Sequence, residues 1–120
     1  MSEYLFINTN NDLLRIASES IVYITADGNY SRITVSNGDE RMVVQQLGTI
    51  ERLIKEQLRH SGVNFIRLGR SLIINHEFIY YINLSHQQLE LADGRQRYAT
   101  LTASREALRQ LKEVIEKQRL

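Results

Sequence analysis

Short runs of alternating apolar and polar residues fill most of this chain. The alternation is clearest where Ile33 and Val35 follow Arg32 and Thr34, and a period of two residues is typical of a strand with one buried face. The runs that predict strands are Tyr4–Ile7, Leu13–Ala17, Ile21–Ala26, Tyr30–Ser36, Arg41–Gln45, Phe65–Asn75, Phe78–Leu84, Gln88–Ala92 and Arg97–Leu101.

Turn-forming residues join several of these runs directly. Asn37-Gly38 follows one run and Asp93-Gly94 follows another; Asn-Gly and Asp-Gly are strong hairpin signals. Because strands joined by tight turns pair side by side in opposite directions, we expect mostly antiparallel sheets.

Two segments instead repeat their apolar residues at helical spacing. The first runs from Leu47 to about His60 and the second from Ser104, a good N-cap, to about Arg119. Their apolar stripes are Leu47, Ile50, Ile54 and Leu58 in the first, and Leu108, Leu111 and Ile115 in the second. The pattern therefore predicts a mainly β fold with two short amphipathic helices packed on it.

Composition narrows the class of protein. The chain has 120 residues, of which 42% are hydrophobic and 24% charged, so we expect one globular domain over residues 1–120. Its lack of cysteine excludes a disulfide framework and a cysteine zinc site. Neither a signal peptide nor an 18-residue apolar run is evident, and we therefore expect a cytoplasmic protein that does not enter the membrane.

Catalytic chemistry finds little support in the sequence. His60, His76 and His86 lie in no nucleophile or metal motif, and the glycine patterns that cradle phosphates are missing. We therefore expect no enzyme activity, no small-molecule substrate, no metal and no cofactor.

The distribution of arginine is more informative than the net charge of +1. Arg67 and Arg70 lie inside the apolar run Phe65–Asn75, and residues 94–105 contain Arg95, Arg97 and Arg105 without any acid. Arginine is seldom buried without a partner, and its guanidinium fork suits phosphate oxygens and the edge of guanine. The charge pattern alone leaves two readings open: ion pairs with acids of the helices, or contacts with an external anion.

Several motifs in a fixed order resemble the LytTR DNA-binding domain. They are Ile21-Val-Tyr-Ile24, Ala26-Asp-Gly-Asn-Tyr30, the run Phe65–Asn75, Phe78-Ile79, and Leu101-Thr-Ala-Ser-Arg105 before a terminal helix. The resemblance extends from about Tyr4 to Lys112. It implies an elongated fold of about three small, mostly antiparallel sheets in a bacterial transcriptional regulator. It also implies that pairs of domains bind imperfect direct repeats in double-stranded DNA, inserting loops into successive major grooves.

The resemblance also nominates residues. Tyr30, Arg70 and Arg105 match the family's main DNA contacts. Arg67, Ser71 and Asn75 match the central motif, although Arg67 and Asn75 are also open to a structural role. From the charge pattern we add Arg95, Arg97 and again Arg67 as candidates that neutralise phosphates.

Two departures from the family pattern affect these expectations. Gly69 replaces the histidine that commonly precedes Arg70, which removes a backbone contact or loosens the loop. No receiver domain is evident in the 120 residues, so we expect a stand-alone regulator and assume no phosphorelay. The alternative is a protein-interaction or accessory module of the same fold that pairs with other regulators without binding DNA.

Overall fold

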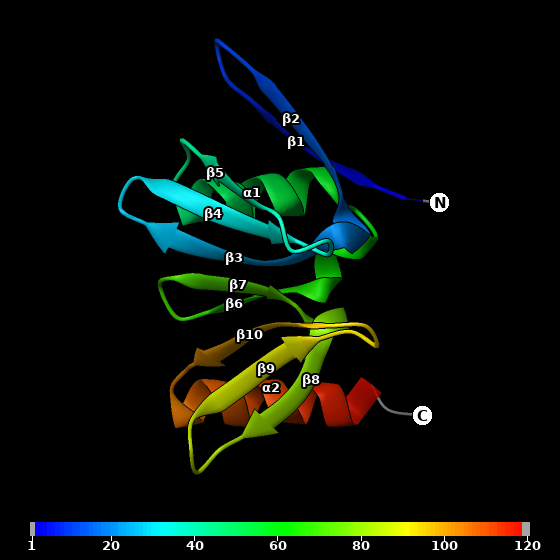
Figure 1. Cartoon of the computed structure of the whole chain (residues 1–120), viewed down its shortest axis with the longest axis vertical. Helices are drawn as coiled ribbons and strands as arrows, with labels where there is room; N and C mark the ends of the chain where they lie inside the picture. The colour runs from blue at the N-terminus through cyan, green and yellow to red at the C-terminus, as the bar shows by residue number, and fades with distance from the viewer. Residues whose placement is uncertain (1, 119–120) are drawn as a thin grey trace. The chain divides into compact units, whose positions relative to one another are not determined.

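The computed structural model describes residues 2–118, and its strands form three separate antiparallel sheets (Figure 1). The sheets have two, five and three strands, and two α-helices accompany them. This confirms the predicted class, mainly β with small antiparallel sheets and two short helices. Contacts divide the chain after Glu77 into two compact units, which are described in turn.

The first unit contains the two-stranded and five-stranded sheets. Its elements are β1 (Tyr4–Asn8), β2 (Leu13–Ala17), β3 (Ile21–Asp27), β4 (Tyr30–Val35), β5 (Glu40–Val43), α1 (Leu47–Gln57), β6 (Phe65–Leu68) and β7 (Leu72–Asn75). Strands β1 and β2 pair as a hairpin, and the larger sheet has the order β5-β4-β3-β7-β6. Short 3₁₀ turns lie at Ser18–Ser20 and Ser61–Asn64, and a third, His76–Phe78, spans the boundary after Glu77.

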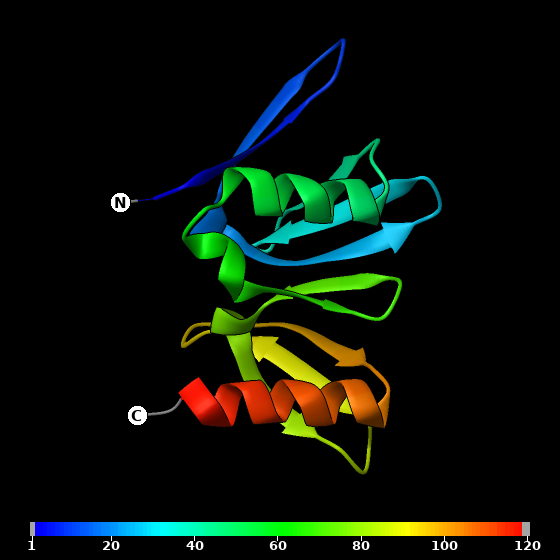
Figure 2. The same cartoon turned by 180° about the vertical axis from the view of Figure 1, so that it is seen from behind.

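Helix α1 covers one face of the five-stranded sheet and encloses the core of this unit, as the view from behind shows (Figure 2). The predicted apolar stripe is confirmed, because Leu47, Ile50, Ile54 and Leu58 are all buried. They pack with buried residues of β1, β3 and β7, among them Leu5, Ile24 and Ile73. Burial of aliphatic side chains is the main stabilising contribution of such a helix.

Helix α1 ends at Gln57, three residues before the predicted end. Leu58 leaves the helical conformation with φ −100° and ψ 77° while its side chain stays buried. Beyond it, the carboxylate of Glu3 accepts the backbone N–H groups of His60 and Ser61. These tertiary bonds replace helical ones, which sequence periodicity does not reveal.

The run Phe65–Asn75 is a hairpin of two strands, so the expectation of one strand over the whole run was wrong. Strands β6 and β7 pair antiparallel up to Leu68 and Leu72, and Gly69-Arg70-Ser71 forms the turn between them. Gly69 has φ +65°, a conformation that costs other residues about 1–2 kcal/mol. Gly69 therefore lets the chain reverse at this point.

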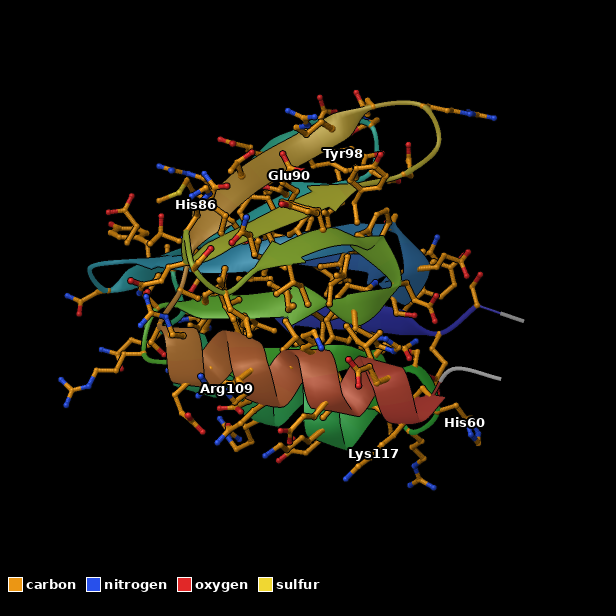
Figure 3. All side chains as sticks on the ribbon, turned by 90° about the horizontal axis from the view of Figure 1, so that it is seen from below. His60, His86, Glu90, Tyr98, Arg109 and Lys117 are labelled. Carbon is orange, nitrogen blue, oxygen red and sulfur yellow. The ribbon has the colours of Figure 1, made fainter. Side chains whose placement is uncertain are left out.

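The second unit is a three-stranded sheet with one helix. It comprises β8 (Ile79–Asn83), β9 (Gln88–Ala92), β10 (Arg97–Thr102) and α2 (Arg105–Gln118), and the strand order is β10-β9-β8. Leu89, Leu91, Leu108 and Leu111 are buried. Arg109 and Lys117 lie on the exposed side of α2 (Figure 3).

The predicted cap of α2 is confirmed. The Oγ atom of Ser104 accepts the N–H of Ala107 at 3.1 Å, which satisfies one of the free donors of the first turn. The predicted end of this helix at Arg119 lies outside the described residues.

Candidate nucleic-acid interface

The turn between β3 and β4 presents Tyr30 at the surface. Asp27 and Tyr30 close the hairpin, and Gly28 adopts φ +63° within the turn. Tyr30 is 46% exposed, whereas the next residue, Ser31, is fully buried and donates its hydroxyl to the carbonyl of Gln45 at 2.7 Å. Because successive strand residues face opposite sides, the inward Ser31 holds Tyr30 outward.

The turn between β6 and β7 separates the two arginines of the central motif. The guanidinium of Arg67 donates through Nε to the carbonyl of Gly69 at 3.0 Å and through Nη2 to that of Arg70 at 2.9 Å. Its Nη1 donates to Oε1 of Glu51 on α1 at 2.9 Å. Arg67 is therefore used inside the protein, where it holds the turn in shape and ties it to α1.

Arg70, by contrast, is exposed at the tip of the same turn. Within residues 2–118, no hydrogen bond or ion pair engages its side chain. All five guanidinium donors are available to an external acceptor.

The two turns lie side by side at one end of the five-stranded sheet (Figure 1). Strand β3 pairs with both β4 and β7, and the N–H of Ala26 donates to the carbonyl of Ser71 at 2.9 Å. The fold thus brings the exposed residues Tyr30, Arg70 and Ser71 to the same end of one sheet, although 40 residues separate the first two in sequence.

Asn75 is withdrawn from this surface. Its side chain is only 2% exposed, its Nδ2 donates to the carbonyl of Ile21 at 2.9 Å, and its Oδ1 accepts the N–H of Glu77 at 3.0 Å. A buried amide whose nitrogen and oxygen are both hydrogen-bonded is typical of a structural role. Asn75 therefore connects the end of β7 to the start of β3.

In the second unit, Arg105 is the exposed first residue of α2. Its Nε donates to the carbonyl of Leu84 at 3.3 Å, while its two terminal nitrogens have no partner in the described part of the chain. The connection from β8 to β9 is also tied to the segment before α2, since Ala103 donates its N–H to the carbonyl of Gln87 at 3.3 Å. The hydrogen bond to Leu84 orients the guanidinium of Arg105 and leaves its terminal nitrogens available.

Arg95 and Arg97 are not brought together with Arg105. Arg97 begins β10 and Arg105 follows its end, and a strand of this length separates its ends by roughly 17–20 Å. Arg97 also forms an ion pair with Glu90 at 3.5 Å. Both arginines are exposed, but they belong to the opposite end of the three-stranded sheet.

The turn from β9 to β10 is organised by Asp93. Its Oδ1 accepts the N–H groups of Arg95 and Gln96, and its Oδ2 accepts the hydroxyl of Tyr98 at 2.5 Å. The Tyr98 hydroxyl, followed by the two backbone donors, lowers the pKa of Asp93 below its ordinary value. Burial and the contact with Asp93 raise the pKa of Tyr98, whose ring meets Phe78 edge to face at 5.6 Å. Glu90 and Tyr98 are labelled in Figure 3.

Comparison with known proteins identifies the family. The family model described as the LytTr DNA-binding domain matches residues 11–116, a segment that spans both units. This chain belongs to that family. Its LytTr domain is similar to the solved structure of a LytTr DNA-binding domain from Bacillus cereus, with 16% sequence identity and a TM-score of 0.65. The match covers 94% of this chain and 96% of the other, and at this identity it shows a shared fold.

No curated protein sequence matches the chain. Membership of the LytTr family makes this a DNA-binding domain of the regulator type. None of the helices in residues 2–118 is long and apolar enough to cross a membrane. Those residues also contain no cluster of three histidine or acidic side chains placed to hold a metal ion.

The sequence left open an ion pair between Arg67 and a helix acid, but did not identify Glu51 as that acid. Helical spacing predicts that Glu51 pairs with Lys55, whereas the structure pairs Glu51 with Arg67. Sequence patterns also do not reveal the contact of Gln46. Its side-chain amide donates to Oδ1 of Asn29, the residue before Tyr30, at 3.3 Å. Such contacts join residues about 17 positions apart in sequence, and the local patterns that predict strands and helices do not reveal them.

Proposed function

We propose that this LytTr domain is a sequence-specific transcriptional regulator that inserts its loops into successive major grooves of a direct-repeat DNA site. The observation that carries the proposal is the difference between the environments of two arginine side chains. Arg67 is engaged by Glu51 and the turn carbonyls, whereas Arg70 is exposed at the same end of the sheet as Tyr30, with its donors available.

In this proposal the two adjacent turns of the first unit enter one groove. Arg70 donates two hydrogen bonds to the O6 and N7 atoms of a guanine, the pairing that its fork fits best. Tyr30 packs against a sugar or a thymine methyl group and donates its hydroxyl, and Ser71 contacts the adjacent backbone. Arg105, in the second unit, reads or clamps DNA in the next groove.

In this proposal, four other candidates lie outside the base contacts. Arg67 positions the turn that carries Arg70, and Asn75 supports β7 from inside the sheet. Arg95 and Arg97 stand outside the base-reading site, and as exposed cations they contribute to attraction of the phosphate backbone at most. A location in the cytoplasm, where chromosomal DNA is accessible, and pairing of two domains on the DNA belong to the same proposal.

The test begins with selection of bound sequences from random DNA by the purified chain. We expect two similar half-sites about one helical turn, or roughly 10 base pairs, apart. Binding of the selected site is then measured for Arg70→Ala and Arg105→Ala over a series of salt concentrations. Loss of a bidentate arginine–guanine contact costs about 1–3 kcal/mol and relaxes the preference at one position.

A matched control is Arg59→Ala. Arg59 is an exposed arginine of the same unit, but it follows the C-terminal end of α1, away from the turns next to the start of that helix. We expect its replacement to change affinity by less than about twofold. Wild-type affinity in both Arg70→Ala and Arg105→Ala would overturn the assignment.

A further inference from the structure

A groove of about 660 Å³ lies between the hairpin of β1 and β2 and the strand β5. Residues 9–14 line one side and residues 41–45 the other, and Ile7 also lines the groove. A smaller recess of about 290 Å³ adjoins it, since Leu14 and Arg41 line both spaces. All of these residues belong to the first unit and take no part in the proposed DNA contacts.

This groove follows the edge of β5. Arg41, Met42 and Val43 are consecutive and all line it, whereas side chains on one face of a strand recur at every second residue. β5 is the terminal strand of its sheet and pairs only with β4. Across the groove, β2 pairs only with β1. The backbone groups on the outer edge of β5 are therefore open in the described part of the chain.

The outer edge of β1, unlike that of β5, is blocked by a side chain. On β1, the side chain of Gln57 accepts the N–H of Phe6 at 2.7 Å and donates to the carbonyl of Phe6 at 3.1 Å. Gln57 thus completes the edge of β1 as another strand would. Exposed strand edges are usually blocked in this or a similar way because they invite pairing. β5 pairs with β4 in regular register, without a bulge.

The side chains around the groove indicate what fits it. Leu13, Met42 and Val44 are apolar and are 59%, 43% and 64% exposed. Two carboxylates mark its ends: Asp12 lines the larger groove with Val44, and Asp39 lines the recess with Ile16. Neither carboxylate forms an ion pair in residues 2–118.

The overall charge of the groove is negative. Glu40 adds a third carboxylate, although Arg32 lies 3.7 Å from it. Arg41 is the one basic residue among the described residues that line the groove. A complementary ligand is therefore apolar in the middle and basic at its ends.

We propose that the edge of β5 binds an extended segment of another protein, which adds to the five-stranded sheet as a further strand. Its alternate apolar side chains cover Leu13, Met42 and Val44, and a lysine or arginine near each end meets Asp12 and Asp39. The segment from Asp12, just before β2, to Ile16 within it corresponds to roughly five extended residues. Main-chain bonds to a sheet edge supply affinity in this mode, and the side-chain pockets supply specificity.

The probe is a nine-residue peptide, acetylated and amidated, in which valine and threonine alternate and a lysine stands near each end. It is titrated into the full ¹⁵N-labelled chain without DNA. We expect saturable chemical-shift changes confined to residues 9–16 and 39–45, and slower amide exchange in β5. A peptide with aspartate in place of lysine is expected to bind at least about threefold more weakly, the scale of two exposed ion pairs.

Variants of the chain test the site. Leu13→Glu and Met42→Glu each weaken binding of the lysine peptide by about tenfold or more. The matched control is Val63→Glu, because Val63 is 76% exposed in the same unit but lies outside the groove. Amide spectra of all three variants report whether the fold is kept.

Several outcomes would overturn this proposal. One is the absence of shifts in residues 39–45, and another is equal binding of both peptides. A third is self-association of the chain that Leu13→Glu abolishes, because the groove would then belong to a second copy. None of these outcomes depends on whether the chain binds DNA.

Discussion

The guanidinium of Arg67 lies 2.9 Å from the carboxylate of Glu51, and this ion pair joins the β6–β7 turn to α1. The side chains are 27% and 33% exposed, so solvent screens the pair only in part. The same guanidinium also bonds to the carbonyls of Gly69 and Arg70. Arg67, a charged residue within an apolar run of the sequence, therefore stabilises the turn that carries Arg70.

Arg67→Lys should therefore lower stability although it keeps the charge. A lysine has no planar fork and cannot serve three acceptors at once, so we expect the free energy of unfolding to fall by about 1–2 kcal/mol. Urea denaturation measures this change. If Arg67 mainly contacted phosphate, the lysine variant would keep its stability and its salt dependence of DNA binding.

Asn75→Ala should destabilise the fold more than it affects DNA contacts. The change leaves the carbonyl of Ile21 and the N–H of Glu77 without their partner, which we expect to cost about 2–3 kcal/mol. The fraction of protein that remains folded should bind DNA with wild-type affinity. Wild-type stability together with weakened binding would instead show that Asn75 is a DNA contact.

Gly69→Ala tests the backbone of the Arg70 turn. A Cβ atom at Gly69 would meet nothing within 4 Å, so the expected loss of about 1 kcal/mol comes from φ +65° alone. Gly94→Ala is the matched control, because that site is equally open but has no positive φ. Thermal unfolding of the two variants should move in opposite directions or differ by several degrees. Equal melting temperatures would contradict this account.

Tyr98→Phe should raise the pKa of Asp93 toward its ordinary value, because the lost hydroxyl is the largest cause of the lowered pKa. A lowered folded-state pKa gives stability that is present above the ordinary aspartate value of 3.8 and is lost as the pH falls below it. The variant should lose less stability in acid. A carboxyl NMR titration measures the shift, and Glu3, whose pKa is lowered mainly by Ser61, is the internal control. An unchanged Asp93 pKa would exclude the hydrogen bond.

Local signals in the sequence determined most of the secondary structure. Alternation located the strands, and β2 and β9 agree with the predicted bounds at both ends. Ser104 marked the start of α2, and Asn37-Gly38 and Asp93-Gly94 marked two hairpins. These features depend on residues a few positions apart, which a single sequence displays directly.

Tertiary structure alone decided which arginine is free. Arg67 and Arg70 lie in the same apolar run and carry the same charge, so the charge pattern left both open to an internal ion pair or an external anion. Glu51 lies 16 residues before Arg67, on α1, and its position is set by the packing of the helix on the sheet. Packing likewise buried Asn75 and set Tyr30 at the same sheet end as Arg70. Contacts between distant segments have no periodicity to read, and the folded chain alone reveals them.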